Sequence, residues 1–153
     1  MASMSGFTSR NLSPDQVHTV YPLVREAIPT LDLKTWTRAA KRIANAKRMD
    51  QVGIRVVFRS PRQLPCGLFL YRRDKDLGYG PILAAEYFVA LDVLDPAPVV
   101  RALAEEMDAL AQRLGCAAIR ALVRRHSPAV DAGLREAGLV AEGAMLWKRL
   151  PPG

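Results

Sequence analysis

Apolar side chains recur every three or four positions in four stretches of the chain, and this spacing predicts amphipathic helices. The third stretch has the clearest boundaries, because Asp95 is a good N-cap, a proline follows it at the first helical position, and Gly115 suits the C-terminal end. The chain should therefore contain one long helix and three shorter ones. The expected helices cover residues 17–28, 32–49, 95–114 and 127–137.

Elsewhere apolar and polar residues alternate, which predicts β-strands. The expected strands are residues 7–12, 52–59, 64–72, 82–94, 116–123 and 139–150. Those between residues 52 and 94 follow one another through turns, as in an antiparallel meander, whereas the long helix lets strand 116–123 return parallel to strand 82–94. We predict one α/β domain over residues 1–153, with a mixed sheet of an antiparallel meander plus a parallel pair and with helices on both faces.

Composition narrows the class of protein. A length of 153 residues suits one domain, and half of the residues are apolar while 24% are charged, as in a soluble globular protein. No apolar stretch is long enough to span a membrane and the N-terminus carries no apolar signal segment, so a cytoplasmic protein is expected. The two cysteines, Cys66 and Cys116, are too few for a disulfide framework, and with two histidines they predict no metal site.

The net charge of +7 is concentrated in one part of the chain. Residues 34–59 contain eight lysines and arginines against the single acidic residue Asp50, and the rest of the chain is neutral. Such a basic patch favours an anionic small molecule or an acidic protein surface as partner, and an ordinary solvated helix face is the alternative. A nucleic acid is not expected, because Trp36, the aromatic residue nearest the patch, is assigned to the core by its spacing.

Two further groups of charged residues can each be interpreted in two ways. Arg124, Arg125 and His126 follow a predicted strand, where they would either meet an anion at the carboxyl end of the sheet or form a solvated turn. Glu86 interrupts the apolar strand 82–94, and an ion pair with Arg120 of the next strand would be a structural reason for it. A second carboxylate, six residues later, would lie on the same face of that strand. The residues expected on this face are Ala84, Glu86, Phe88, Ala90 and Asp92.

The order of these elements resembles the GNAT family of acetyl-CoA-dependent N-acetyltransferases. Residues 127–139, SPAVDAGLREAGL, add to the resemblance, because they predict a short helix that ends at Gly138-Leu139, as in that family. The resemblance covers nearly the whole chain. It implies that strands 82–94 and 116–123 splay apart and hold the pantetheine arm of acetyl-CoA between them.

The same resemblance implies roles for individual residues. Glu86 matches a glutamate that accepts a proton from the amine substrate in several branches of the family, and apolar neighbours would leave its carboxylate partly desolvated, as suits a base. Arg101 would supply a cation to the phosphates of the cofactor. The residues implied to line the cofactor groove are Ala90, Leu91, Asp92 and Val93.

Two positions depart from the family pattern. Where the family has glycines whose backbone N–H groups hold the CoA pyrophosphate, this chain has DPAP at residues 95–98, which removes donors and adds a negative charge. Leu134 stands where many members have a tyrosine that protonates the leaving thiolate. Another acid would then be needed, and Tyr79, Tyr87 and Cys116 are the candidates.

Two functions therefore stay open. One is an acyl-CoA-dependent N-acyltransferase, in which Glu86 is the base and an amine attacks the thioester directly. The other is a module that keeps the fold without catalysis and binds an anionic ligand or a protein partner through its cleft or its basic helix. In either case, the closing strand 139–150 is where a homodimer would form.

Overall fold

The described strands form one sheet in which the order along the chain is also the order in space. The computed structural model describes residues 6–153 except 46, 48, 49, 125 and 126. Its elements are β1 (Phe7–Asn11), the 3-10 helix η1 (Pro14–Gln16), α1 (Tyr21–Ala27), α2 (Leu33–Ala44), β2 (Val52–Arg59), β3 (Leu64–Asp76), β4 (Gly80–Ala90), α3 (Ala97–Arg113), β5 (Ala118–Ala121) and α4 (Pro128–Glu136). Strands β1 to β4 are antiparallel and β5 is parallel to β4, so the predicted mixed sheet is confirmed.

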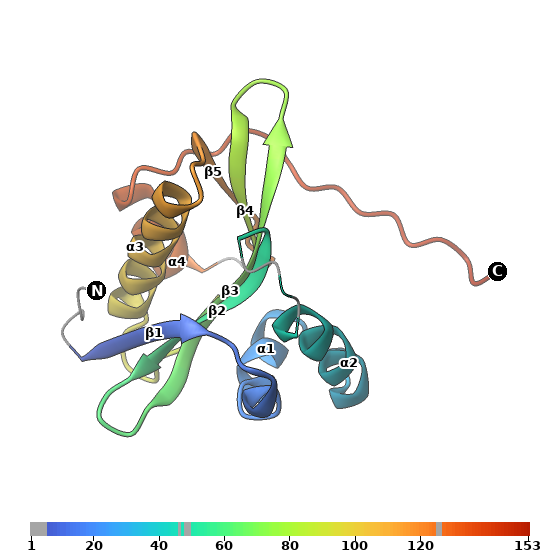
Figure 1. The fold of residues 1–153 in the computed structure, drawn as a ribbon, viewed down its shortest axis with the longest axis vertical. Helices are drawn as coiled ribbons and strands as arrows, with labels where there is room; N and C mark the ends of the chain where they lie inside the picture. The colour runs from blue at the N-terminus through green and yellow to red at the C-terminus, as the bar shows by residue number, and fades with distance from the viewer. Residues whose placement is uncertain (1–5, 46, 48–49, 125–126) are drawn as a thin grey trace.

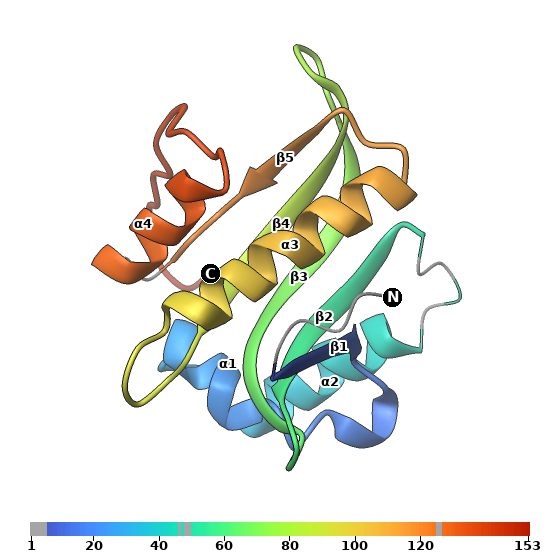
Figure 2. The ribbon, with the colours of Figure 1, turned by 90° about the vertical axis from the view of Figure 1, so that its left-hand side faces the viewer.

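Helices cover both faces of the sheet, which confirms a second part of the predicted fold. Figure 1 shows α3 and α4 on one side of the sheet and α1 and α2 on the other, and Figure 2 looks onto α3 from its own side. Leu103 of α3 packs in one core with Phe69 and Leu83 of the sheet. In the second core Trp36 is buried, and its Nε1 donates to the carbonyl oxygen of Val17 at 2.7 Å. The spacing of Trp36 therefore indicated its burial correctly.

Local sequence explains where the helices begin. Asp32 caps α2 by accepting the N–H of Thr35 at 2.7 Å, and Ser127 caps α4 by accepting the N–H of Val130 at 3.1 Å. Helix α1 is shorter than predicted, because residues 17–20 form turns and a proline stands in its first turn. Helix α2 ends at Ala44, before the predicted end at residue 49. Residues 46, 48 and 49 of the predicted helix lie outside the described residues.

A buried ion pair ties α3 to the sheet. Arg55 Nε donates to Glu106 Oε1 at 2.7 Å, and each side chain is 10% exposed. Arg55 also donates from Nη1 to Asn11 Oδ1 at 3.2 Å, and Asn11 Nδ2 donates to the Tyr71 hydroxyl at 2.9 Å. Because buried charges need partners, this network fixes the position of α3 across β1, β2 and β3.

The last predicted strand does not form, and this prediction is wrong. Residues 140–153, the C-terminal arm, are extended and exposed, and no described strand pairs with them; in Figure 1 the arm leaves the body of the molecule. Strand β5 is likewise shorter and less buried than expected, with Arg120 exposed, because no described strand covers its outer edge. Alternating residues make a segment competent for pairing, but a strand forms only when the segment makes hydrogen bonds with a neighbouring edge, and residues 140–153 form no described ladder with the open edge of β5.

Candidate functional site

Strand β4 carries an irregularity in the middle of the sheet. Leu68 of β3 lies opposite Val89 and Leu70 lies opposite Glu86, so that a step of two residues on β3 corresponds to a step of three on β4. This is a β-bulge, and Tyr87 within it has a φ of +53°, in the left-handed region that a bulky residue rarely adopts. Bulges take a backbone group out of the strand ladder and re-aim side chains, and strained residues gather at functional sites.

The bulge reverses which side chains of β4 face α3. Before the bulge Leu83 and Ala85 pack in the core under α3, and after it Phe88 and Ala90 pack there. Alternation therefore directs Glu86 to the opposite face of the sheet, which α1 and α2 cover. The prediction that Glu86 shares a face with Phe88 and Ala90 is wrong, because the extra residue shifts the alternation.

Glu86 is half-buried, and within the described part of the chain no hydrogen bond or ion pair engages its carboxylate. The predicted alternative, an ion pair with Arg120, is wrong. Arg120 Nη2 instead lies 3.8 Å from Asp74 Oδ2, and both side chains are almost half exposed. The Glu86 carboxylate thus has no partner among the described residues, and its role as a base stays a prediction.

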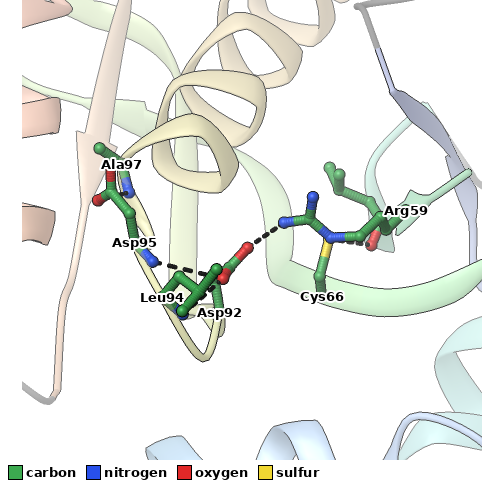
Figure 3. A network of polar contacts seen from close by, with 7 residues as sticks. Arg59, Cys66, Asp92, Leu94, Asp95 and Ala97 are labelled. Carbon is green, nitrogen blue, oxygen red and sulfur yellow. Dashed lines mark hydrogen bonds and ion pairs between the residues drawn. The ribbon is translucent and has the colours of Figure 1, made fainter.

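Carboxylates hold the loop between β4 and α3 in place (Figure 3). Asp92 forms an ion pair with Arg59, and its Oδ1 accepts the N–H of Leu94 at 2.9 Å and that of Asp95 at 3.4 Å. The hydrogen bond from Leu94, together with those from Asp95 and Arg59, lowers the pKa of Asp92, so this group is ionised at neutral pH. The negative charge of Asp92 is therefore already compensated by the Arg59 guanidinium and by two backbone N–H groups of the loop.

This loop changes the placement of the residues implied to bind a cofactor. Ala90 is the last residue of β4, whereas Leu91, Asp92 and Val93 follow the strand, and Val93 is 98% exposed. Placing residues 91–93 on a strand is therefore wrong, because Asp92 bonds with the backbone of a turn where a strand would bond with its neighbour. Arg101 is exposed on α3. The part of these residues in cofactor binding stays a prediction.

Cys66 lies beside this loop in Figure 3 and is buried. Its Sγ is 3.5 Å from the carbonyl oxygen of Val57, and burial raises the pKa of the thiol to about 11. A thiol that stays protonated at neutral pH is a poor nucleophile. Cys66 is therefore a packing residue of β3.

The start of α3 lacks the donors that a pyrophosphate needs. Asp95 Oδ1 accepts the N–H of Ala97 at 3.0 Å, Pro96 and Pro98 have no N–H, and Val100 donates to the carbonyl oxygen of Pro96 at 3.0 Å. The Asp95 carboxylate would also repel an anion at this helix end. The residues present therefore do not fit a CoA pyrophosphate at this position.

A groove of about 530 Å³ lies between α3 and α4, and its lining is acidic. The two helices approach closely because Gly133 has no side chain, and a Cβ there would lie 2.5 Å from Val100. In the described lining four carboxylates stand against the single guanidinium of Arg101, so an anion is disfavoured. The four acidic residues are Asp95, Glu105, Asp108 and Glu136.

A second groove, of about 560 Å³ but shallow and wide open to solvent, follows α2 on the other side of the sheet, and its lining is basic. Its cations are Lys34, Arg38 and Lys41, which share one face of α2, and His18 lies across from them after η1. No acidic residue belongs to the described lining. The Thr37 hydroxyl, from the same helix, is buried and has no hydrogen-bond partner among the described residues.

The predicted basic patch of residues 34–59 is not one surface. Arg55 is buried against Glu106, and Arg59 is paired with Asp92. Arg48 lies outside the described residues. The remaining cations of the patch are exposed: Lys34, Arg38 and Lys41 line the basic groove, and Arg42 and Lys47 lie outside that lining.

The candidate acids lie in different places. Leu134 is buried in the core. The Tyr79 hydroxyl, near the β3–β4 turn, donates to Glu142, and this hydrogen bond raises the pKa of Tyr79. Tyr87 is next to Glu86 in the bulge, and the Arg124 guanidinium lies 5.6 Å from the centre of its ring. Cys116 is half-buried ahead of β5. The other two residues of the Arg124 motif, 125 and 126, lie outside the described residues.

Two classes of feature are not found in the described chain. No helix there is long and apolar enough to cross a membrane. No group of three or more His, Cys, Asp and Glu side chains among the described residues is arranged to hold a metal ion.

Several solved structures have the same fold as this chain. No family model and no curated protein matches the sequence. Among solved structures, glucosamine-6-phosphate N-acetyltransferase from Arabidopsis thaliana superposes with a TM-score of 0.72 at 13% identity, covering 95% of this chain and 99% of that one. An aminoglycoside 6'-N-acetyltransferase from Acinetobacter baumannii gives a TM-score of 0.74 at 10% identity, covering 97% and 100%. An aminoglycoside N-acetyltransferase bound to a bisubstrate analogue of CoA gives 0.73 at 12% identity, covering 95% and 98%. This similarity, together with the mixed sheet and its single parallel pair, shows that the chain has the fold of the GNAT acetyltransferases.

Proposed function

We propose that the protein transfers an acyl group from a thioester to an amine, with Glu86 as the group that takes the amine proton. The main support is a half-buried carboxylate, unpaired within the described chain, beside a bulge in β4 of an acetyltransferase fold. An amine attacks only from its deprotonated form, and a carboxylate within hydrogen-bond reach can accept the proton. Because Arg120 lies near Asp74 and not near Glu86, no described ion pair competes with an amine for the Glu86 carboxylate.

In the proposed step the amine nitrogen bonds to the carbonyl carbon of the thioester, and the amine proton passes to Glu86. The carbon–sulfur bond then breaks, the thiolate leaves and takes a proton from water, and Glu86 returns the amine proton to the solvent, so that no net proton is gained or lost. A backbone N–H freed from the strand ladder by the bulge at Tyr87 would stabilise the negative carbonyl oxygen of the adduct.

The donor is expected to be held by its acyl end and not by a nucleotide. The start of α3 and the acidic α3–α4 groove both disfavour phosphates. Acetyl-CoA and a short acetyl thioester that lacks a nucleotide should therefore react with kcat/KM values within about tenfold of each other. A donor preference far above that, in favour of acetyl-CoA, would show that the nucleotide is bound elsewhere on the chain.

The test follows thiol release from acetyl-CoA and from the acetyl thioester of N-acetylcysteamine, with a set of primary amines. Glu86→Gln should lower kcat/KM at least about 100-fold, because it keeps the shape and removes the base. Glu105→Gln, which changes an exposed carboxylate of α3, is the matched control and should keep full activity. Full activity of Glu86→Gln between about pH 6 and 9 would contradict the role of Glu86, and no turnover of any amine by the unaltered protein would contradict the proposal.

A second candidate function is the binding of an anion in the basic groove along α2. It is favoured by three cations on one helix face with no acidic residue in the same described lining. Clustered cations raise the local potential, and such binding weakens as salt is added. Retention on heparin that falls steeply with salt, in a protein without acyl transfer, would favour this function over the first.

A further inference from the structure

The bulge of β4 brings a carboxylate and a guanidinium to the same surface. Tyr87 follows Glu86 in the chain, and the guanidinium carbon of Arg124 lies 5.6 Å from the centre of the Tyr87 ring. Ala85 and Phe88 both pack under α3, so Glu86 and Tyr87 together occupy the step between them, on the opposite face of the sheet. Arg124 therefore reaches the face that carries Glu86.

Strands β4 and β5 part at this point. The last hydrogen bond between them in the described chain runs from the Leu122 N–H to the carbonyl oxygen of Ala85 at 2.8 Å. Glu86 and Tyr87 come directly after Ala85 on one strand, and Arg124 comes two residues after Leu122 on the other. A ligand that lies between these side chains displaces none of the described hydrogen bonds between the two strands.

Two aromatic rings hold the guanidinium of Arg124 in place. Besides the Tyr87 ring, the ring of Trp147 in the C-terminal arm has its centre 5.3 Å from the guanidinium carbon, and both distances are within the range of cation–π contacts. The rings give the N–H groups no lone pair, and no hydrogen bond or ion pair in the described chain engages this guanidinium. A guanidinium positioned in this way suits a planar oxyanion, which accepts two parallel hydrogen bonds from it.

Glu86 and Arg124 do not neutralise each other. The ion pairs of the described residues join other side chains, and neither of these two takes part in one. Residues 115–130 contain three arginines and no acidic residue, and Glu86 is the one acidic residue between positions 77 and 91. Opposite charges that share a surface without pairing attract a ligand that carries both signs.

We propose that the acceptor substrate is an amino acid, whose carboxylate is bound by Arg124 while its amine lies at Glu86. This inference rests on the proposed acyl transfer and names the substrate class of that site. The amine nitrogen attacks the thioester as described above, and the carboxylate takes no part in the bond changes. Arg124 is thus a binding residue that decides specificity.

A carboxylate is favoured over a phosphate as the anionic group of the acceptor. A phosphate monoester carries close to two negative charges at neutral pH, whereas a carboxylate carries one. The one guanidinium that the described residues bring to the Tyr87 ring balances a single charge. The planar carboxylate also matches the flat fork of donors that arginine presents.

The first test compares ω-amino acids, from glycine to 6-aminohexanoate, with the alkylamines of the same chain length. The donor is the acetyl thioester of N-acetylcysteamine, and rates are referred to the deprotonated amine. The best amino acid should exceed its alkylamine at least about 20-fold in kcat/KM, as expected for a charge-assisted pair of hydrogen bonds.

Arg124→Gln should abolish this preference by raising the KM of the amino acid, while its kcat and the alkylamine rates stay within about threefold. The matched control is Arg120→Gln, because Arg120 is an exposed arginine of β5 whose guanidinium lies near Asp74, and it should keep the preference. Acyl transfer to alkylamines as efficient as to every amino acid would overturn this inference and leave the acyl transfer standing.

The second test measures binding without a donor, by titrating the same compounds into nitrogen-15-labelled protein. The indole N–H signal of Trp147 should shift and saturate with the amino acid, whereas that of the buried Trp36 stays constant as the internal reference. Arg124→Gln should weaken this binding at least about tenfold, and the alkylamines should cause no shift.

The outcomes of the binding test separate the two proposals. Binding of an amino acid without turnover of any amine would support this ligand class and overturn only the acyl transfer. No shift with any amino acid of the series would overturn the inference. Tighter binding of 3-aminopropylphosphonate than of every amino acid would overturn the choice of a carboxylate.

Discussion

Two grooves of similar volume lie on opposite sides of the sheet and carry opposite charge. The groove between α3 and α4 has four carboxylates and one arginine in its described lining, whereas the groove along α2 has two lysines, an arginine and a histidine and no carboxylate. Both are built on helices that pack an apolar face on the same sheet. The architecture is thus shared, and the difference lies entirely in the polar faces of the helices.

This difference shows that the fold does not by itself determine where the protein presents positive charge. The resemblance to the GNAT family implies that the phosphates of CoA bind at the start of α3. Here Asp95 accepts a hydrogen bond at that helix end, which also adjoins the acidic groove. Charge favourable to anions lies instead along α2. A core can therefore keep one architecture while the exposed side chains, which contribute little to stability, move the anion-attracting surface to the other face.

The largest expected effect concerns the buried ion pair that holds α3 on the sheet. Glu106→Ala would leave Arg55 buried without its partner and should lower the free energy of unfolding by about 3–5 kcal/mol, measured by urea denaturation. Glu105→Ala, the exposed neighbour on the same helix, should change it by less than about 0.5 kcal/mol. If the two variants were equally stable, the ion pair would not be what holds α3 on the sheet.

The next effect concerns the basic groove. Reversing Lys34, Arg38 and Lys41 to glutamate should weaken heparin binding at low salt at least about 30-fold, while the free energy of unfolding changes by less than about 1 kcal/mol. The control makes the same change of net charge elsewhere, at Lys75, Arg113 and Arg135, which are exposed away from α2. Equal weakening in both triple variants would mean that net charge, and not the groove, attracts the anion.

The smallest effect concerns the start of α3. Asp95→Ser keeps an oxygen that can cap Ala97 and removes the charge, so CoA should bind about two- to fivefold more tightly by calorimetry. Asp108→Ser changes a carboxylate of the same groove farther along the helix and should have less effect. Tight binding of CoA by the unaltered protein, with no gain from Asp95→Ser, would show that this end of α3 does accept phosphates.

Much of the fold was predictable from local patterns, but the site was not. The spacing of Trp36 indicated its burial, and Asp95 and Gly115 bracketed the long helix to within two residues. The bulge at Tyr87 had no signal in the sequence, because it arises from the register of β4 against β3. Every inference that relied on regular alternation through the bulge, including the shared face of Glu86 and Phe88, failed for this reason.

The same limit applies to partners of charged residues. Arg55 and Arg59 counted as members of a basic patch, whereas packing placed one against Glu106 of a distant helix and the other against Asp92. Thr37 had no signal as a groove residue, since an isolated threonine in a helix is ordinary. The exposure of Trp147 had no signal in the sequence either, because the pattern of residues 139–150 predicts a strand whether or not the segment pairs with a neighbouring edge after folding.

The sequence by itself determined the elements, their order, the two apolar helix faces and the lack of donors at residues 95–98, because periodicity, capping and proline act over a few residues. Tertiary structure alone decided which charges neutralise one another, which face Glu86 occupies, and that the C-terminal arm is left without a strand partner among the described residues. These depend on strand register and on contacts between residues far apart in the chain, and no local pattern encodes a distance between two segments that meet only after folding.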